Sequence, residues 1–192
     1  VEFMVKNSPE AIYHLVDLGV QFEKEKGRLK LTKEGGHQAK RIAYIGDYTG
    51  KEIEETLVAR VKEHPNITIL EDSFAIDFLV KNKACYGAKA IIEGYQQEIH
   101  ADQTILATGG LGQLYNTTTN AEIATGDGFA MALRAGLKLK DIEFIQFHPT
   151  AFAEKTFPRF LISEAVRGEG AIIINSAGER IMKGVHPLED LA

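Results

Sequence analysis

Residues 105–112 have the sequence Ile105-Leu106-Ala107-Thr108-Gly109-Gly110-Leu111-Gly112, an apolar run followed at once by glycines. The apolar part, residues 103–107, predicts a strand. Glycines at the carboxyl end of a strand let the backbone pass close to a flat or phosphorylated ligand. A tight turn after a core strand explains the same pattern, and this motif alone favours neither interpretation.

Further along the chain, Gly126-Asp127-Gly128 precedes a predicted helix over 129–135, which Gly136 ends. Asp127 has two possible roles. It can cap the helix, or it can hydrogen-bond a ribityl or ribose hydroxyl of a ligand. Taken alone, the motif favours the cap.

The remaining pattern predicts a mixed α/β chain. A helix is expected to begin at Ser8-Pro9 and end at Gly19, and a second to begin with a capping box at Thr49. A β-meander and further short strands are expected at 74–80, 84–92, 96–101, 142–147, 171–175 and 179–182, whereas 161–166 fits either a helix or a strand. These elements predict an α/β domain with an inserted β-meander over 1–137, and the start of a smaller α+β domain over 138–192.

Composition narrows the possible functions. The chain has 27 acidic and 22 basic residues, a net charge of −5, which argues against nucleic acid or an anionic membrane as the main partner. No apolar run reaches the roughly 18 residues of a membrane span. Cys85 is the single cysteine, so no disulfide within the chain and no multi-cysteine metal site is expected, and a cytoplasmic location is the simplest. We interpret the chain as an internal piece of a longer protein.

Three polar motifs are candidate ligand sites. Gln146-Phe147-His148-Pro149-Thr150 places a histidine where it can bind a carboxylate or move a proton, although a lone histidine is more often a buried structural one. In residues 163–170 (SEAVRGEG), Ser163 can hold a carboxylate, or Arg167 can pair with Glu164 or Glu169 and brace a turn. Glu34 precedes two glycines and His37, and an exposed loop acid is its simpler interpretation.

Taken in order, the motifs are more specific than any one of them. They are residues 34–37 (EGGH), 46–50 (GDYTG), 107–110 (ATGG), 118–120 (TTN), 125–128 (TGDG), 143–150 (EFIQFHPT) and 163–170 (SEAVRGEG). This series resembles the succinate dehydrogenase/fumarate reductase flavoprotein superfamily and, within it, is most similar to the L-aspartate oxidases. The resemblance covers nearly the whole chain.

The resemblance implies an FAD-binding, Rossmann-like domain, incomplete here, and the start of a substrate-capping domain. It implies oxidation of L-aspartate to iminoaspartate, the first step of de novo NAD synthesis, with hydride passing from Cα to flavin N5 and with O2 or fumarate as oxidant. Quinolinate synthase is the implied downstream partner. The implied FAD contacts are Phe74, Ala75, Thr108, Gly109, Gly110 and Asp127, and the implied substrate contacts are Glu34, Gln146, His148, Ser163 and Glu164.

Glu34 decides between subfamilies. A carboxylate at this position pairs with the ammonium group of aspartate and repels a plain dicarboxylate such as succinate. The alternatives are a succinate dehydrogenase or fumarate reductase flavoprotein subunit with an iron–sulfur partner, and a non-catalytic domain of degenerate flavin fold. The intact glycines, together with His148, Ser163 and Glu164, argue against the latter.

Two features of the family are missing from this sequence. The strand–GxGxxG–helix unit that holds the FAD pyrophosphate is absent, and the family's catalytic arginine is expected just beyond Ala192. We therefore expect no catalytic residue within the chain and no metal site. We also expect that the chain alone binds FAD weakly or not at all and has no measurable turnover.

Overall fold

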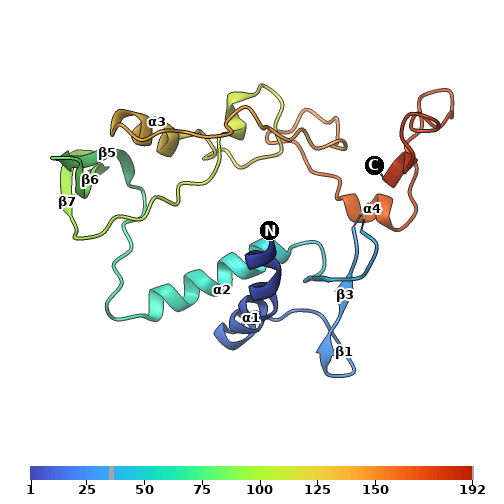
Figure 1. The fold of residues 1–192 in the computed structure, drawn as a ribbon, viewed down its shortest axis with the longest axis horizontal. Helices are drawn as coiled ribbons and strands as arrows, with labels where there is room; N and C mark the ends of the chain where they lie inside the picture. The colour runs from blue at the N-terminus through green and yellow to red at the C-terminus, as the bar shows by residue number, and fades with distance from the viewer. Residues whose placement is uncertain (35–36, 192) are drawn as a thin grey trace. The chain divides into compact units, whose positions relative to one another are not determined.

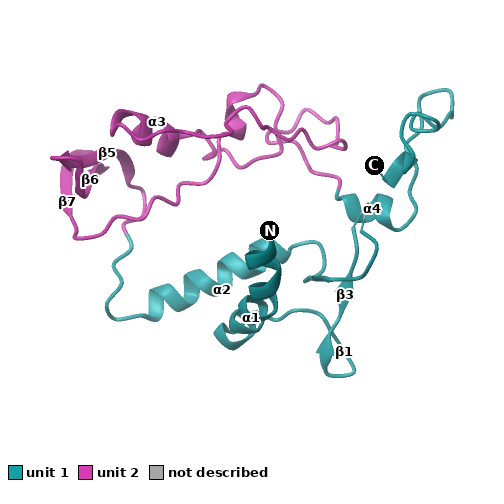
Figure 2. Cartoon of the chain, viewed as in Figure 1, with its two compact units in different colours: residues 1–69, 163–192 teal, residues 70–162 magenta. Residues whose placement is uncertain are grey.

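A computed structural model describes residues 1–34 and 37–191. Gly35 and Gly36 of the predicted ligand loop lie outside the described residues, as does Ala192, after which the catalytic arginine is expected. The chain divides into two units, residues 1–69 with 163–192 and residues 70–162 (Figure 2). Each unit is described by itself.

The first unit begins with helix α1 (Glu2–Leu18), which starts earlier than Ser8. Pro9 therefore lies inside the helix, where it has no N–H to donate to the carbonyl of Val5. The hydroxyl of Ser8 donates to that carbonyl at 3.0 Å, so Ser8 compensates for the proline and does not cap the helix. Gly19 ends α1 in the left-handed conformation, as predicted, with φ of 112°.

Helix α2 (Thr49–Glu63) packs against α1. Arg60 joins them, because its Nε donates to the carbonyl of Leu18 at 2.7 Å. The predicted capping box does not form. The hydroxyl of Thr49 accepts from the N–H of Ile45 at 2.9 Å and so fixes the preceding turn instead.

Two small antiparallel pairs lie between these helices in the sequence. Strand β1 (Lys24–Glu25) pairs with β2 (Arg28–Leu29), and β3 (Leu31–Thr32) pairs with β4 (Ile42–Ala43). Val20 and Phe22, 1% and 4% exposed, form the buried apolar centre of this unit.

The C-terminal part of the same unit is mostly irregular. It contains the short helix α4 (Glu164–Gly168), an antiparallel bridge between Ile174 and Arg180, and the 3₁₀ helix η2 (Glu189–Leu191). The predicted turn between residues 175 and 179 is confirmed, but the strands predicted on either side of it, 171–175 and 179–182, do not form beyond this one bridge. Gly178 takes φ of 82° there, and Asn175 accepts from the N–H of Ala177 and of Glu179.

The second unit is built on the predicted meander. Strands β5 (Phe74–Lys81), β6 (Ala84–Ile92) and β7 (Tyr95–His100) form an antiparallel sheet in sequence order (Figure 1). The β6–β7 hairpin turns at Glu93 and Gly94, which both have positive φ. Gly87 lies so close to the carbonyl of Ile99 that a Cβ there would collide with it.

Helix α3 (Asp127–Arg134) packs against β5, and the 3₁₀ helix η1 (Gly112–Leu114) precedes it in the chain. Met131 and Ala132 on α3 and Leu79 on β5 are 5% exposed or less and form the buried apolar centre of this unit. The helix predicted over 129–135 is confirmed, with its start two residues earlier.

Two further predicted strands, 103–107 and 142–147, do not form either. An apolar segment becomes a strand only when another strand bonds to its backbone. None of the residues in 1–34 and 37–191 does so for either segment, and Ile105 is 91% and Phe144 77% exposed. Hydrogen bonds from Phe144 to Asp141 and from Ile145 to Glu143 instead make turns in the second segment.

Candidate functional site

The turn at residues 108–110 lies against the start of α3. The N–H of Gly126 donates to the carbonyl of Gly110 at 3.1 Å. A Cβ added at Gly128 would collide with Oγ1 of Thr108, so only glycine allows this close approach. The structure therefore brings Thr108, Gly110 and the first turn of α3 together, three parts of the predicted cofactor site.

Gly109 takes a backbone conformation that favours glycine. Its φ of 72° is in the left-handed region, and a Cβ at Gly109 or at Gly110 would meet nothing within 4 Å. Both glycines therefore border open space in this unit, where a ligand can approach the main chain closely.

Asp127 is the first residue of α3, and Gly126 occupies the cap position without any side-chain cap bond. The interpretation of Asp127 as a helix cap is therefore wrong. Its exposed carboxylate accepts from the hydroxyl of Thr125 in a very short hydrogen bond. A carboxylate at the N-terminus of a helix is also favoured by the helix dipole.

Phe74 and Ala75 are the first two residues of β5, and both are exposed. The far end of α3 holds this strand through Arg134. Its Nε lies 2.9 Å from Oδ2 of Asp77, and its Nη2 donates to the carbonyl of Ile76 at 2.6 Å. One helix thus connects the strand carrying Phe74 and Ala75 with the glycine turn at 108–110.

Gln146 and His148 lie in an irregular segment that is fixed at two points. The ring of Phe147, between them, meets the ring of Tyr115 edge-on, with centroids 5.1 Å apart. Nδ1 of His148 lies 3.2 Å from the N–H and 2.9 Å from the carbonyl of Thr150, so the ring tautomer decides which bond forms. His148 is half-buried and Gln146 is exposed.

Thr150 fixes the end of this segment. Its hydroxyl donates to the carbonyl of Ile162 at 2.9 Å, and the N–H of Ile162 donates back to the carbonyl of Thr150 at 3.2 Å. Ala151 and Leu161 continue the pairing as an antiparallel bridge. The backbone on which His148 lies is therefore held from both sides within the second unit.

Glu34 lies in the first unit and is hydrogen-bonded to His37. The N–H of His37 donates to the carbonyl of Glu34 at 3.1 Å, and the N–H of Glu34 lies 3.4 Å from Nδ1 of His37. Both side chains are half-buried.

Ser163 and Glu164 begin α4. Oγ of Ser163 accepts from the N–H of Ala165 at 3.2 Å, so Ser163 is the helix cap. Glu164 pairs with Arg167 one turn later, at 3.5 Å between Oε1 and Nη2. The predicted pairing of Arg167 with Glu164 is therefore confirmed.

The sequence pattern did not reveal a buried ionic cluster around Asp190. Arg167 and Asp190 are each 4% exposed, and Nη1 of Arg167 donates to the main-chain carbonyl of Asp190 at 2.9 Å. Only the SEAVRGEG motif pointed toward the cluster, because Asp190 and Arg180 belong to no periodic or spaced pattern. A hollow of about 350 Å³ borders the cluster, lined in part by Arg167, Arg180, Leu188 and Asp190.

Contacts within the cluster shift the pKa values of Asp190 and Arg180. The N–H of Ile173 and then the Arg180 guanidinium lower the pKa of Asp190 below its ordinary value of 3.8. Hydrogen bonding to Asp190 is the main cause that raises the pKa of Arg180. Asp190 is therefore a carboxylate at neutral pH.

The structure thus gathers the predicted residues into two sets. Thr108, Gly110 and Asp127 meet in the second unit, where α3 also holds the strand of Phe74 and Ala75 and where Gln146 and His148 lie. Glu34, Ser163 and Glu164 belong to the first unit. Over residues 1–34 and 37–191 there is no group of three or more His, Cys, Asp or Glu side chains placed to hold a metal. In the part of the chain that the structure describes, no helix is long and apolar enough to cross a membrane.

Comparison with known proteins identifies this arrangement of glycine turn, meander and helix. The chain belongs to the FAD binding domain family, whose model matches residues 1–192. The predicted cofactor, FAD, is thereby confirmed.

Its similarity to L-aspartate oxidases is also confirmed. The chain is 41% identical to the L-aspartate oxidase of Nostoc sp. over 100% of its own length and 34% of that protein. It is 43% identical to that of Clostridium perfringens, over 97% of the chain and 43% of the relative. It is 44% identical to the L-aspartate oxidase of Neisseria meningitidis, over 95% of the chain and 37% of the relative. The chain thus spans about a third to two fifths of the length of these relatives.

Solved structures share the fold. An E. coli quinol fumarate reductase FrdA variant matches with a TM-score of 0.88 and 32% identity, over 96% of this chain and 32% of that one. Mycobacterium smegmatis Sdh1 in complex with UQ1 matches with a TM-score of 0.77 and 32% identity, over 92% of this chain and 32% of that one. The predicted fold class is thereby confirmed at the level of an FAD-binding domain of mixed helix and sheet.

Proposed function

We propose that the full-length protein containing this chain oxidises L-aspartate to iminoaspartate with FAD, the first step of de novo NAD synthesis. The observation that carries the proposal is the similarity to L-aspartate oxidases of several organisms, at 41–44% identity over nearly the whole chain. FAD, when bound, supplies the two-electron oxidation of the substrate, and O2 or fumarate reoxidises it.

In this proposal a Rossmann-like core, completed by sequence outside this chain, holds the cofactor. The flavin would lie close to the main chain at Thr108, Gly109 and Gly110, since the glycines border open space. Asp127 accepts a hydrogen bond from a cofactor hydroxyl, and the exposed start of β5 at Phe74 and Ala75 meets the adenine end. Each of these residues is exposed in its unit, as a ligand contact requires.

Each unit carries side chains that would contact the dicarboxylate substrate. Gln146 and His148 donate to one carboxylate. Ser163 has its oxygen engaged by Ala165, which leaves the hydroxyl proton to donate to a second acceptor. Glu164, half-buried beside Arg167, contacts the substrate from α4. Residues 138–192 form the start of a substrate-capping domain in this scheme.

Glu34 supplies the selectivity for an amino acid. Its half-buried carboxylate attracts the ammonium group of aspartate and repels a dicarboxylate that has none, and the effect is larger in partly desolvated surroundings than in water.

A second candidate is a succinate dehydrogenase or fumarate reductase flavoprotein subunit. The observation that favours it is the TM-score of 0.88 to a fumarate reductase chain. The two candidates share FAD and most of the substrate contacts. They differ in the role of Glu34, which selects the ammonium group of aspartate in the first candidate and has no such role in the second.

The proposed downstream partner is quinolinate synthase, which would consume iminoaspartate. The proposed location is the cytoplasm. The relative from Nicotiana tabacum is named chloroplastic.

The test is a product assay on the purified full-length protein loaded with FAD. It is incubated with L-aspartate and either O2 or fumarate, and oxaloacetate from hydrolysis of the imine is measured with D-aspartate and succinate as controls. Oxaloacetate formed from L-aspartate alone supports the proposal. Oxidation of succinate without oxaloacetate formation supports the second candidate instead.

A further inference from the structure

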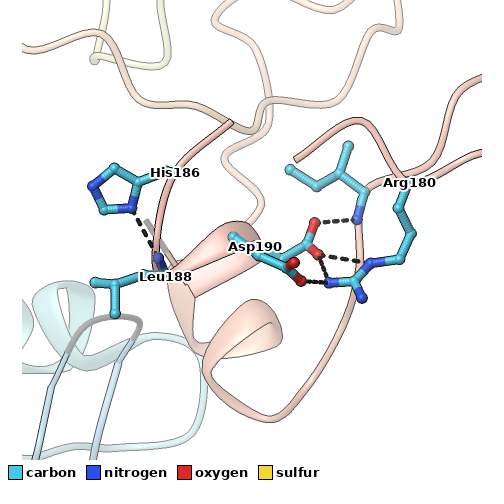
Figure 3. Close-up of polar contacts among 6 residues, drawn as sticks. Arg180, His186, Leu188 and Asp190 are labelled. Carbon is cyan, nitrogen blue, oxygen red and sulfur yellow. Dashed lines mark hydrogen bonds and ion pairs between the residues drawn. The ribbon is translucent and has the colours of Figure 1, made fainter. Parts of the chain in front are cut away.

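Asp190 is fixed by both its side chain and its main chain. Its carboxylate, 5% exposed, accepts from the N–H of Ile173 at 2.8 Å and from Nε and Nη2 of Arg180 at 3.2 and 2.5 Å (Figure 3). Figure 3 shows the carboxylate lying against the Arg180 guanidinium. Charge-assisted bonds of this kind to a buried group are among the stronger ones in proteins.

The carbonyl of the same residue holds Arg167. This guanidinium donates from Nη1 to the Asp190 carbonyl at 2.9 Å, and its Nη2 lies 3.5 Å from Oε1 of Glu164. Arg167 is buried and planar, so fixing one edge of its guanidinium restricts where the other edge can lie.

A chain of contacts therefore runs from Asp190 through Arg167 to Glu164. Residues 164 and 190 are far apart in sequence, yet α4 and η2 pack together in the first unit. Glu189 offers a contrast, because it also pairs with Arg180, at 2.6 Å, but its side chain is 39% exposed.

We propose that Asp190 is a positioning residue for Glu164 and acts through the guanidinium of Arg167. The inference rests on the proposed contact of Glu164 with the substrate. If Asp190 loses its anchor, its carbonyl shifts, Arg167 follows, and Glu164 no longer lies where a dicarboxylate meets it. A displacement of about 1 Å in such a group costs up to roughly 100-fold in activity.

The experiment is a double-mutant cycle in the full-length, FAD-loaded protein. Asp190→Asn keeps the shape and an acceptor for Ile173 but presents an amide N–H₂ group or a neutral oxygen to Arg180. The variants are Asp190→Asn, Glu164→Gln and the pair, with Glu189→Gln as the matched control. Arg180→Gln is a second way to loosen Asp190 if the first variant does not fold. The readouts are KM and kcat for L-aspartate, and FAD content.

We expect Asp190→Asn and Arg180→Gln to lower kcat/KM for L-aspartate by about 10-fold or more, with FAD content unchanged. In the Glu164→Gln background the same change should lower kcat/KM by less than about twofold, because residues acting through one another are not additive. Glu189→Gln should leave kcat/KM and FAD content unchanged.

Equal effects of Asp190→Asn in the two backgrounds, or effects no larger than those of Glu189→Gln, would overturn the positioning role. A wild-type protein that binds FAD but does not oxidise L-aspartate would overturn the proposed function, and this inference with it. The two failures are distinguished by the wild-type measurement.

Discussion

Arg134 on α3 and Asp77 on β5 join the two elements that flank the candidate cofactor site, with 2.9 Å between Nε and Oδ2. The same guanidinium donates to the carbonyl of Ile76, so it makes one ionic and one main-chain contact. The carboxylate is one-third exposed and the guanidinium about half exposed, which limits the strength of the ion pair.

Arg134→Met removes both contacts, whereas Asp77→Asn removes only the charge. We expect the first to lower the free energy of unfolding by about 1–2 kcal/mol and the second by less than about 1 kcal/mol. Urea denaturation of the full-length protein measures both. Lys140→Met is the control, since Lys140 is 88% exposed and lies 3.9 Å from Asp141. Equal losses in all three variants would contradict a specific link between α3 and β5.

Gly128 allows Thr108 to pack against α3, so a single methyl group tests that close approach. Gly128→Ala should destabilise the protein by about 1–3 kcal/mol and lower its FAD content, because the added Cβ meets the Thr108 hydroxyl. The ratio of flavin to protein absorbance and a thermal melt report the two effects. Gly50→Ala in α2 is the matched control, as its Cβ would meet nothing within 4 Å. If both variants keep full FAD content, the glycine approach does not serve the cofactor.

Asp190 gives a pH dependence with a definite sign. Its pKa is lowered in the folded protein, so its contribution to stability is fully present above 3.8 and is lost as pH falls from there through the lower folded value. Wild type should therefore lose stability more steeply below pH 3.8 than Asp190→Asn does, while the variant is less stable at neutral pH. Thermal melts from pH 2.5 to 7 measure this, and parallel curves would show that Asp190 contributes nothing.

Cys85 is exposed, and its pKa is lowered from the ordinary 9.0, chiefly by a hydrogen bond from Thr104 and then by the backbone at Gly87. The rate of iodoacetamide labelling should therefore reach half its maximum below pH 9.0. Thr104→Val should move that midpoint upward, because the thiolate loses a donor. Thr125→Val, which alters a hydroxyl in a different contact, serves as the control. Identical midpoints in wild type and Thr104→Val would refute the role of Thr104.

Local signals in the sequence predicted those elements whose hydrogen bonds join residues close together in the sequence. The meander around Gly94, the end of α1 at Gly19 and the helix after Gly126 depend on turn geometry and on side-chain alternation, both of which are visible within a few residues. The same reasoning failed at residues 103–107, because a strand also needs a partner and an apolar run does not specify one.

In the candidate site, too, some features could be predicted from short motifs and others could not. Glycine motifs pointed to the turn at Thr108 and to α3, since only glycine fits where backbone and side chain meet closely. The role of Ser8 beside Pro9 and the cluster at Asp190 could not be predicted. The first depends on which carbonyl a proline leaves unpaired, and the second on residues far apart in sequence that meet only in the folded chain.

We propose that a flavoprotein containing this chain takes electrons from L-aspartate and selects it through Glu34. The direct measurement is anaerobic loss of flavin absorbance in the full-length protein with L-aspartate or succinate, in wild type and in Glu34→Gln. We predict that L-aspartate bleaches the wild-type flavin, that succinate does not, and that Glu34→Gln weakens only the reaction with L-aspartate, by roughly 10-fold or more. Bleaching by succinate that is unaffected by Glu34→Gln would contradict the account and favour a succinate dehydrogenase or fumarate reductase subunit.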